Sequence, residues 1–251
     1  EEIQPIIDQT PPKATTMALP EPLLSSTDAY VTAICYIGSK SLSHVLSCIE
    51  RCKTRLLDIG AESETARRQI ITSVMEYWKD QPGIAVNIVD KLLNYTILTP
   101  LSVIQWAIVE DNSAGDKLAE SYIFEMVYGT VHKVTSRVRN LVTQGSGKEM
   151  DQDKRMELEE TLVREKKAME EMFAVLEEAL VSWANGSKDQ AMEAGLGETS
   201  DEKQIRTWAE RWLRVFRRKM AVEEAFLVEA TKPKPMEDEA MEKMEEDVAE
   251  V

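Results

Sequence analysis

The chain has 251 residues and a mass of 28.4 kDa, enough for one large domain or two small ones with a buried core. Its composition, 43% apolar and 30% charged, is that of a soluble globular protein, and its low aromatic content (6%) and 10 glycines argue against an all-β sandwich or barrel. No apolar run approaches the ~18 residues of a membrane span, and three cysteines exclude a disulfide framework and favour a reducing compartment.

The net charge of −15 is unevenly distributed. Segments 27–147 and 185–231, which carry most of the apolar pattern, each have a net charge of −1, whereas 148–184 and 232–251 each carry −5. We therefore interpret 232–251 as an acidic disordered tail, and the proline-rich segment 1–26 as a linker from a preceding domain. The excess negative charge makes free nucleic acid a poor direct partner for this chain.

Between residue 27 and about residue 100, apolar residues recur at helical spacing in stretches separated by turns. A first helix is expected over about 28–37, starting at Thr27 or Asp28. A second is expected from Ser41 or Ser43 to Gly60. A third over about 62–80 and a fourth after Pro82 complete this part of the chain.

Thr99 followed by Pro100 predicts the start of a fifth helix, in which Trp106 is expected to face the core. A longer sixth helix is expected to begin near Asp116 after a turn. This rhythm of helices and short turns predicts an all-α fold of stacked antiparallel helix pairs, a HEAT-like α-α superhelix, as one helical-repeat domain over 27–231.

Beyond residue 127 the apolar spacing becomes a seven-residue repeat, which is typical of coiled coils. The repeat runs through Val127, Val131, Val134, Val138 and Leu141. The Gly145-Ser146-Gly147 stretch predicts a turn, and a second seam, interrupted at Glu165, leads to Trp183. We expect a protruding antiparallel coiled-coil hairpin over about 127–180, with a charged tip over 142–170 that the fold does not need. From Phe173 onward the seam is apolar enough to belong to the core.

A last helix is expected over about 201–229. Its apolar face is expected to contain Ile205, Trp208, Trp212, Val215 and Phe216. The candidate partner contacts are four arginines expected on the side away from Trp208 and Trp212, namely Arg211, Arg214, Arg217 and Arg218. Two interpretations remain open. The arginines are either a solvated face paired with nearby glutamates (Glu210, Glu223 and Glu224), or they meet an acidic partner, RNA phosphate or the chain's own acidic tail.

His44, Cys48 and Cys52 share one side of the second helix, and Cys35 is expected to approach across the preceding turn. This spacing is compatible with part of a zinc site. Cysteine also packs as a small hydrophobic residue, and the short knuckle usual between paired zinc ligands is missing, so we assign no metal ligand. With two histidines and no nucleophile or phosphate-loop motif, we predict no catalytic residue, no cofactor and no enzymatic activity.

Four stretches resemble the large subunit of the nuclear cap-binding complex. They are Gly38–His44, Val74–Trp78, Ile84–Leu93 and Ile97–Ile108. That subunit has three helical domains, and the four stretches are similar to the C-terminal one. This domain resembles the middle domain of the translation-initiation scaffold factor four-G. The close resemblance covers about 30–141, and beyond it only the order of elements agrees. It implies that this chain is one part of a protein two to three times longer.

The resemblance implies a non-enzymatic scaffold in the nucleus that shuttles to the cytoplasm. In that family the small subunit, an RNA-recognition-motif protein, holds the capped RNA, and the large subunit clamps it and recruits splicing, 3′-end processing, export and nonsense-mediated-decay factors. No membrane or small-molecule substrate is implied. Two alternatives remain: another helical-repeat adaptor in translation or transport, and a metal-dependent enzyme using His44, Cys48 and Cys52.

Overall fold

The computed structural model describes residues 21–109, 115–145, 151–186 and 200–231, and every element within these ranges is a helix. The α-helices are α2 (Glu21–Gly38), α3 (Leu42–Glu62), α4 (Glu64–Tyr77), α5 (Pro82–Asn94), α6 (Pro100–Ile104), α7 (Ser121–Gly145), α8 (Gln152–Asn185) and α10 (Ser200–Thr231). A π-helix, η1 (Gln105–Val109), and a 3-10 helix, η2 (Asp116–Ala119), complete the described elements. None of these helices has both the length and the apolar character needed to cross a membrane.

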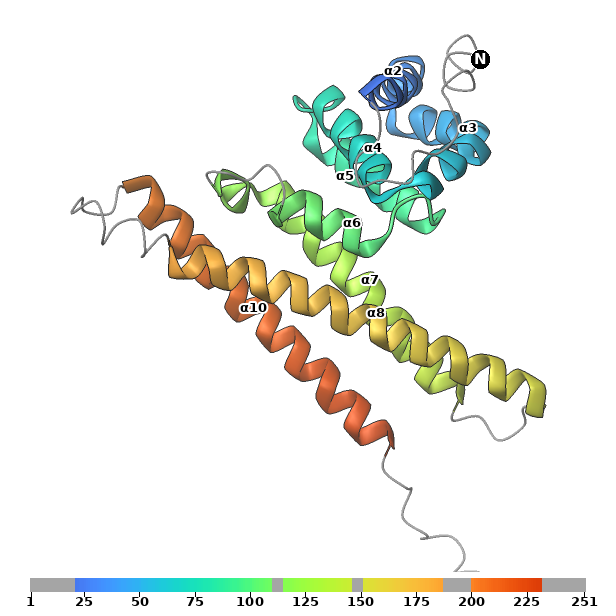
Figure 1. Ribbon diagram of the computed structural model, residues 1–251, viewed down its shortest axis with the longest axis vertical. Coiled ribbons are helices and arrows are strands. Elements are labelled where there is room, and N and C mark those ends of the chain that lie inside the picture. The colour runs from blue at the N-terminus through green and yellow to red at the C-terminus, as the bar shows by residue number, and fades with distance from the viewer. Residues whose placement is uncertain (1–20, 110–114, 146–150, 187–199, 232–251) are drawn as a thin grey trace, which may run out of the picture.

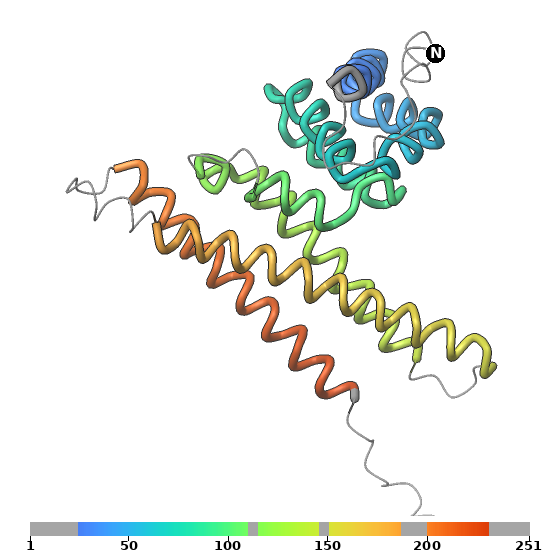
Figure 2. Tube along the Cα trace, viewed as in Figure 1, coloured from blue at the N-terminus to red at the C-terminus, as the bar shows by residue number. Residues whose placement is uncertain are grey.

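The helices form two groups that share one core (Figure 1). Short helices α2 to α6 stack in the upper part of the view, and the three long helices α7, α8 and α10 form an elongated layer below them (Figure 2). Helices α5 and α6 pack on α7 and so connect the stack to the layer. The all-α fold of stacked helix pairs predicted from the sequence is confirmed.

Several helix starts lie where side chains in the sequence can cap them. The hydroxyl of Ser41 accepts a hydrogen bond from the backbone N–H of His44 at 3.2 Å, and Ser63 accepts one from Ala66 at 3.1 Å. Thr99 and Ser102 cap each other's backbone N–H groups reciprocally, with Pro100 in the first turn. The predicted start at Thr99-Pro100 is therefore found in the structure.

The first helix begins earlier than its sequence suggests. Helix α2 starts at Glu21, six residues before the predicted start at Thr27, so the last part of the predicted linker 1–26 is helical. A proline in a first helical turn costs no hydrogen bond, which is why Pro22 does not prevent this start. Ser26 and Thr27 are buried, so the helix already packs into the domain at these residues. Residues 1–20 lie outside the described part of the chain.

Trp106 was expected in the core and is only half-buried, so that prediction is wrong. Helix α6 ends at Ile104 and the chain continues as the π-helix η1, whose wider turn changes which side chains face inward. The Trp106 indole N–H donates to the Thr72 hydroxyl at 2.9 Å, and the Lys117 ammonium lies 4.2 Å from the centre of its ring. Trp106 therefore lies at the edge of the core, where it contacts α4 and η2.

The expected sixth helix near Asp116 is divided into a short η2 and the long α7. Gly115 precedes η2 with φ of 68°, a left-handed conformation that favours glycine. A Cβ atom at Gly115 would also overlap the side chain of Ile205 and crowd the ring of Trp183. This glycine therefore allows η2 to pack closely between the end of α8 and the start of α10.

Helices α7 and α8 lie side by side, and Val127, Val131, Val134 and Val138 are buried along α7 as the repeat predicts. Glu165, where the second seam is interrupted, forms an ion pair with Arg137 across the hairpin at 3.4 Å. The α7–α8 hairpin does not stand alone, since α10 also packs against α8. Coiled-coil geometry stays a prediction, and Ser146 and Gly147 of the predicted turn lie outside the described residues.

The hairpin tip is exposed, but it is shorter than the predicted 142–170. No described side chain between 151 and 168 is buried, whereas Met169 is 4% exposed and belongs to the core. Phe173, Leu176 and Leu180 continue that buried seam, as the apolar pattern predicted.

Replacing residues 143–160 with four glycines is therefore expected to change the melting temperature by less than about 2 °C, because surface changes cost little. The two cut ends lie opposite each other, since Arg137 pairs with Glu165 and Gly145 lies beside Leu158. Thermal unfolding followed by circular dichroism measures the effect. Met169→Ala, at the first buried position, is the control and should cost about 2–5 kcal/mol. A drop above about 6 °C for the tip deletion would show that the tip is packed.

Candidate partner-binding face

Helix α10 carries the four predicted contact arginines and is fixed by aromatic packing. Trp212 and Phe216 are buried, and Phe124 of α7 meets the Trp212 ring edge-to-face with ring centres 5.1 Å apart. Val215 was expected on the same buried face and is instead 40% exposed. It lies about 100° around the helix from the centre of the buried face, which Ala209 also shares.

A buried ion pair fixes the second half of α10. Glu223 is 2% exposed, and its carboxylate contacts Arg139 Nε of α7 at 2.6 Å and Lys219 Nζ at 2.7 Å. Burial by itself would raise the pKa of Glu223, but hydrogen bonds and charge from Arg139 and Lys219 outweigh it and hold the pKa below its ordinary value of 4.5. The carboxylate therefore ties α10 to α7 in its charged form.

The four candidate arginines have different surroundings. Arg217 donates to Glu177 of α8 at 2.8 Å, so this arginine forms an ion pair between α8 and α10. The Arg211 guanidinium lies 4.9 Å from the centre of the Trp208 ring, which corrects the expectation that the arginines lie away from that tryptophan. Arg214 and Arg218 are exposed. Of the nearby glutamates, Glu223 pairs with Lys219 of the same helix and with Arg139 of α7, and not with one of the four arginines.

Exposed apolar residues follow the same side of α10. Val215 and Val222 are 40% and 50% exposed and stand seven residues apart. Together with Arg211 and Arg218 they make a continuous line with steps of four, three and four residues, which places them on one side of a helix. We call Arg211, Val215, Arg218 and Val222 the outer stripe of α10, and Arg214 lies beside it. From the sequence, Val215 was expected on the buried face and no role was assigned to Val222.

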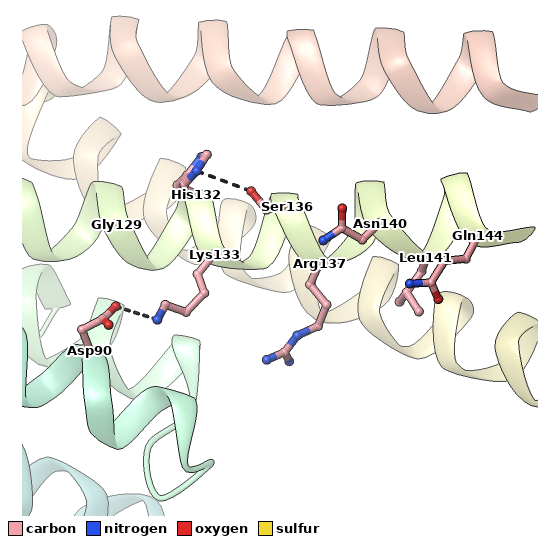
Figure 3. A pocket seen from close by; sticks show the side chains of 9 residues that line it. All are labelled: Asp90, Gly129, His132, Lys133, Ser136, Arg137, Asn140, Leu141 and Gln144. Atoms are coloured by element: carbon pink, nitrogen blue, oxygen red, sulfur yellow. Dashed lines mark hydrogen bonds and ion pairs between the residues drawn. The ribbon is translucent and has the colours of Figure 1, made fainter.

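A groove along α7, with a volume of about 650 Å³, was not anticipated from the sequence (Figure 3). Lys133 and Arg137 point from α7 toward the side of α5, where the Asp90 carboxylate meets Lys133 Nζ at 2.6 Å. His132 and Ser136 lie on the other side of α7. Both cations that line the groove already have carboxylate partners, Asp90 for Lys133 and Glu165 for Arg137, so the groove is a polar surface with little free positive charge.

The predicted cluster on the second helix does not assemble a metal site in the described residues. Cys35 and Cys48 are buried, Cys52 and His44 are half-buried, and no group of three or more His, Cys, Asp or Glu side chains in the described ranges is arranged to hold a metal ion. Burial raises the pKa of the Cys35 thiol to about 11, against a smaller lowering by a hydrogen bond with Trp78. The thiol is therefore protonated at neutral pH and packs as an apolar group.

Comparison with known proteins assigns the fold to a family. A family model described as MIF4G like matches residues 1–225, which include every described helix up to the last turns of α10. The chain belongs to the MIF4G-like family. The match ends inside α10, so residues 226–251 follow the MIF4G-like region.

The relatives of this MIF4G-like chain include several large proteins that share one name. The Nuclear cap-binding protein subunit 1 of Schizosaccharomyces pombe is 32% identical over 107 residues, which are 43% of this chain and 13% of that protein. The Anopheles gambiae protein of the same name is 27% identical over 184 residues, 73% of this chain and 21% of that protein, and the Gallus gallus protein is 24% identical over 111 residues, 44% and 14% respectively. The matches thus span about a fifth or less of these relatives' length, and the resemblance to a large cap-binding subunit is confirmed.

Proposed function

We propose that the chain is a non-enzymatic scaffold domain of the nuclear mRNA cap-binding complex. It helps to hold the small cap-binding subunit, an RNA-recognition-motif protein, and to recruit factors for splicing, 3′-end processing, export and nonsense-mediated decay. The single observation that supports this proposal most is the MIF4G-like match over 1–225 together with relatives named as large cap-binding subunits. The proposed location is the nucleus, with shuttling to the cytoplasm.

Binding in this proposal takes place on the surface of the long-helix layer. Arg211, Arg214 and Arg218 are exposed on a helix that aromatic packing and the Glu223 ion pair hold in place, so a partner meets a preformed surface. A row of exposed guanidinium groups favours an acidic partner surface and accelerates association at low ionic strength. Capped RNA reaches the complex through the small subunit, because this chain carries a net charge of −15.

A capture experiment tests the proposal. The full-length parent and this chain are each immobilised and offered the small subunit with a cap analogue. We expect the parent to capture the subunit and the chain alone to capture it weakly. Capture by neither would overturn the proposed role and favour another helical-repeat adaptor in translation or transport.

Charge reversal tests the face itself. In the parent, the triple variant Arg211→Glu, Arg214→Glu, Arg218→Glu is expected to weaken capture at least tenfold. The matched control reverses three exposed cations near the hairpin tip (Lys154, Arg155 and Arg164) and should leave capture unchanged. Equal capture by both variants would exclude the α10 arginines as partner contacts.

Elemental analysis for zinc separately tests the metal-dependent alternative that uses His44, Cys48 and Cys52.

A further inference from the structure

The outer stripe of α10 is a helix face that the described fold leaves uncovered. Helix α10 packs on α8 and α7 through Trp212 and Phe216, and it lies at the edge of the three-helix layer (Figure 1). Val215 and Val222 are 40% and 50% exposed. Two exposed valines seven residues apart on one surface helix, flanked by arginines, are typical of a face that receives another helix.

The chain itself contains a segment with the complementary pattern. Residues 236–251 contain eight acidic residues and one lysine, and four of the apolar residues stand at steps of three, four and three. These are Met241, Met244, Val248 and Val251. Such spacing predicts an amphipathic helix with one apolar line and an acidic remainder. The segment also lies beyond residue 225, where the MIF4G-like match ends.

We propose that residues 236–251 form an acidic amphipathic helix that folds back, antiparallel, onto the outer stripe of α10. Met241, Met244 and Val248 lie against Val222 and Val215, and the flanking carboxylates face Arg211, Arg214 and Arg218. This inference rests on the same face as the proposed function and names what occupies it when no partner is bound. A highly charged segment can fold when it gains such a surface.

The connection and the lengths fit this arrangement. Pro233 and Pro235 cannot continue α10, which ends at Thr231, so the chain can reverse direction there. A 16-residue helix is about 24 Å long, and Arg211 and Val222, the ends of the outer stripe, are separated by about 17 Å along α10. The folded-back helix therefore covers the whole outer stripe.

The docking is expected to be reversible and salt-sensitive. Exposed ion pairs are individually weak and are screened by salt, while the short tether raises the local concentration of the segment to the millimolar range. An acidic partner surface competes for the same arginines. The segment thus covers the stripe, and a partner has to bind the stripe more tightly than the segment does in order to displace it.

Photo-cross-linking of the full chain, without any partner, tests the proposal. A benzophenone amino acid replaces Val222 in one variant and Val163, a 68% exposed residue of the hairpin, in the control. After irradiation, mass spectrometry is expected to find cross-links from position 222 to residues 236–251, at least fivefold more than from position 163. They should disappear in 0.5 M NaCl and in the variant Glu242→Lys, Glu245→Lys, Glu246→Lys.

Two results would overturn the fold-back helix. One is absence of cross-links from position 222 to 236–251, and the other is equal yield from positions 222 and 163. Mixing isotope-labelled and unlabelled chains separates docking within one chain from docking between two copies, and exclusively mixed products would contradict the proposal. Because the small subunit is not present, this outcome is independent of the capture experiment.

Discussion

Replacing Trp212 with alanine is expected to lower the free energy of unfolding by about 3–5 kcal/mol, because the substitution leaves a large cavity in a packed core. Trp212 is 2% exposed and contacts both Phe124 and Phe216, so the cavity opens where α7 meets α10. For a chain of this size the loss corresponds to a fall in melting temperature of roughly 10 °C. Chemical unfolding followed by circular dichroism measures it.

Trp106→Ala is the matched control for this prediction. The same atoms are removed, but Trp106 is half-buried at the rim and loses chiefly its hydrogen bond with Thr72 and its contact with Lys117. We expect a cost of about 1–2 kcal/mol, since a hydrogen bond contributes about 1 kcal/mol and the exposed part of the ring little. A cost for Trp106→Ala equal to that for Trp212→Ala would contradict the different burial of the two rings.

Glu223→Gln is expected to destabilise the fold by about 1–3 kcal/mol at pH 7, because a charged hydrogen-bonded group is lost from a buried position. The pKa of Glu223 is lowered in the folded state, so its charged form stabilises the fold fully above its unfolded pKa near 4.5. This contribution is lost as the pH falls through the folded pKa. The difference between wild type and Glu223→Gln should therefore shrink below about pH 4.5.

Unfolding in urea at a series of pH values measures this dependence. Glu224→Gln, which changes the neighbouring exposed carboxylate, should stay within about 0.5 kcal/mol of wild type at every pH. A constant difference between wild type and Glu223→Gln down to pH 3 would mean that the carboxylate does not act through its charge.

The features that were predicted correctly from the sequence depend on residues close together in the chain. The Thr99–Ser102 capping box needs only positions three apart, and the buried valines of α7 follow from a local repeat. Trp106 was assigned wrongly because helical spacing assumes a regular α-helix, whereas the chain changes to a π-helix at Gln105. Even within a regular helix the pattern left an error at the edge of the buried face, since Val215 of α10 is exposed.

The environment of the candidate face depends on contacts between distant residues. Glu223 is buried because Arg139, 84 positions earlier, lies opposite it, and nothing in the local sequence of α10 indicates that partner. The groove beside Lys133 likewise depends on how α5 approaches α7. The arginines of α10 were recognisable as a group, but their division into paired and exposed members was not.

The range of these contacts also has a consequence for synthesis on the ribosome. Helices α2, α3 and α4 pack chiefly on one another, so their part of the core can form while the rest of the chain is still being made. The layer of long helices depends on contacts between distant residues. Trp183 donates to the Ile108 carbonyl 75 residues earlier, and Arg139 can pair with Glu223 only after α10 has been made. Until α10 emerges, the parts of α7 and α8 that pack against α10 stay exposed. A translational pause between Asn185 and Thr231 would thus expose the nascent chain to aggregation, and this is the interval in which a chaperone would act.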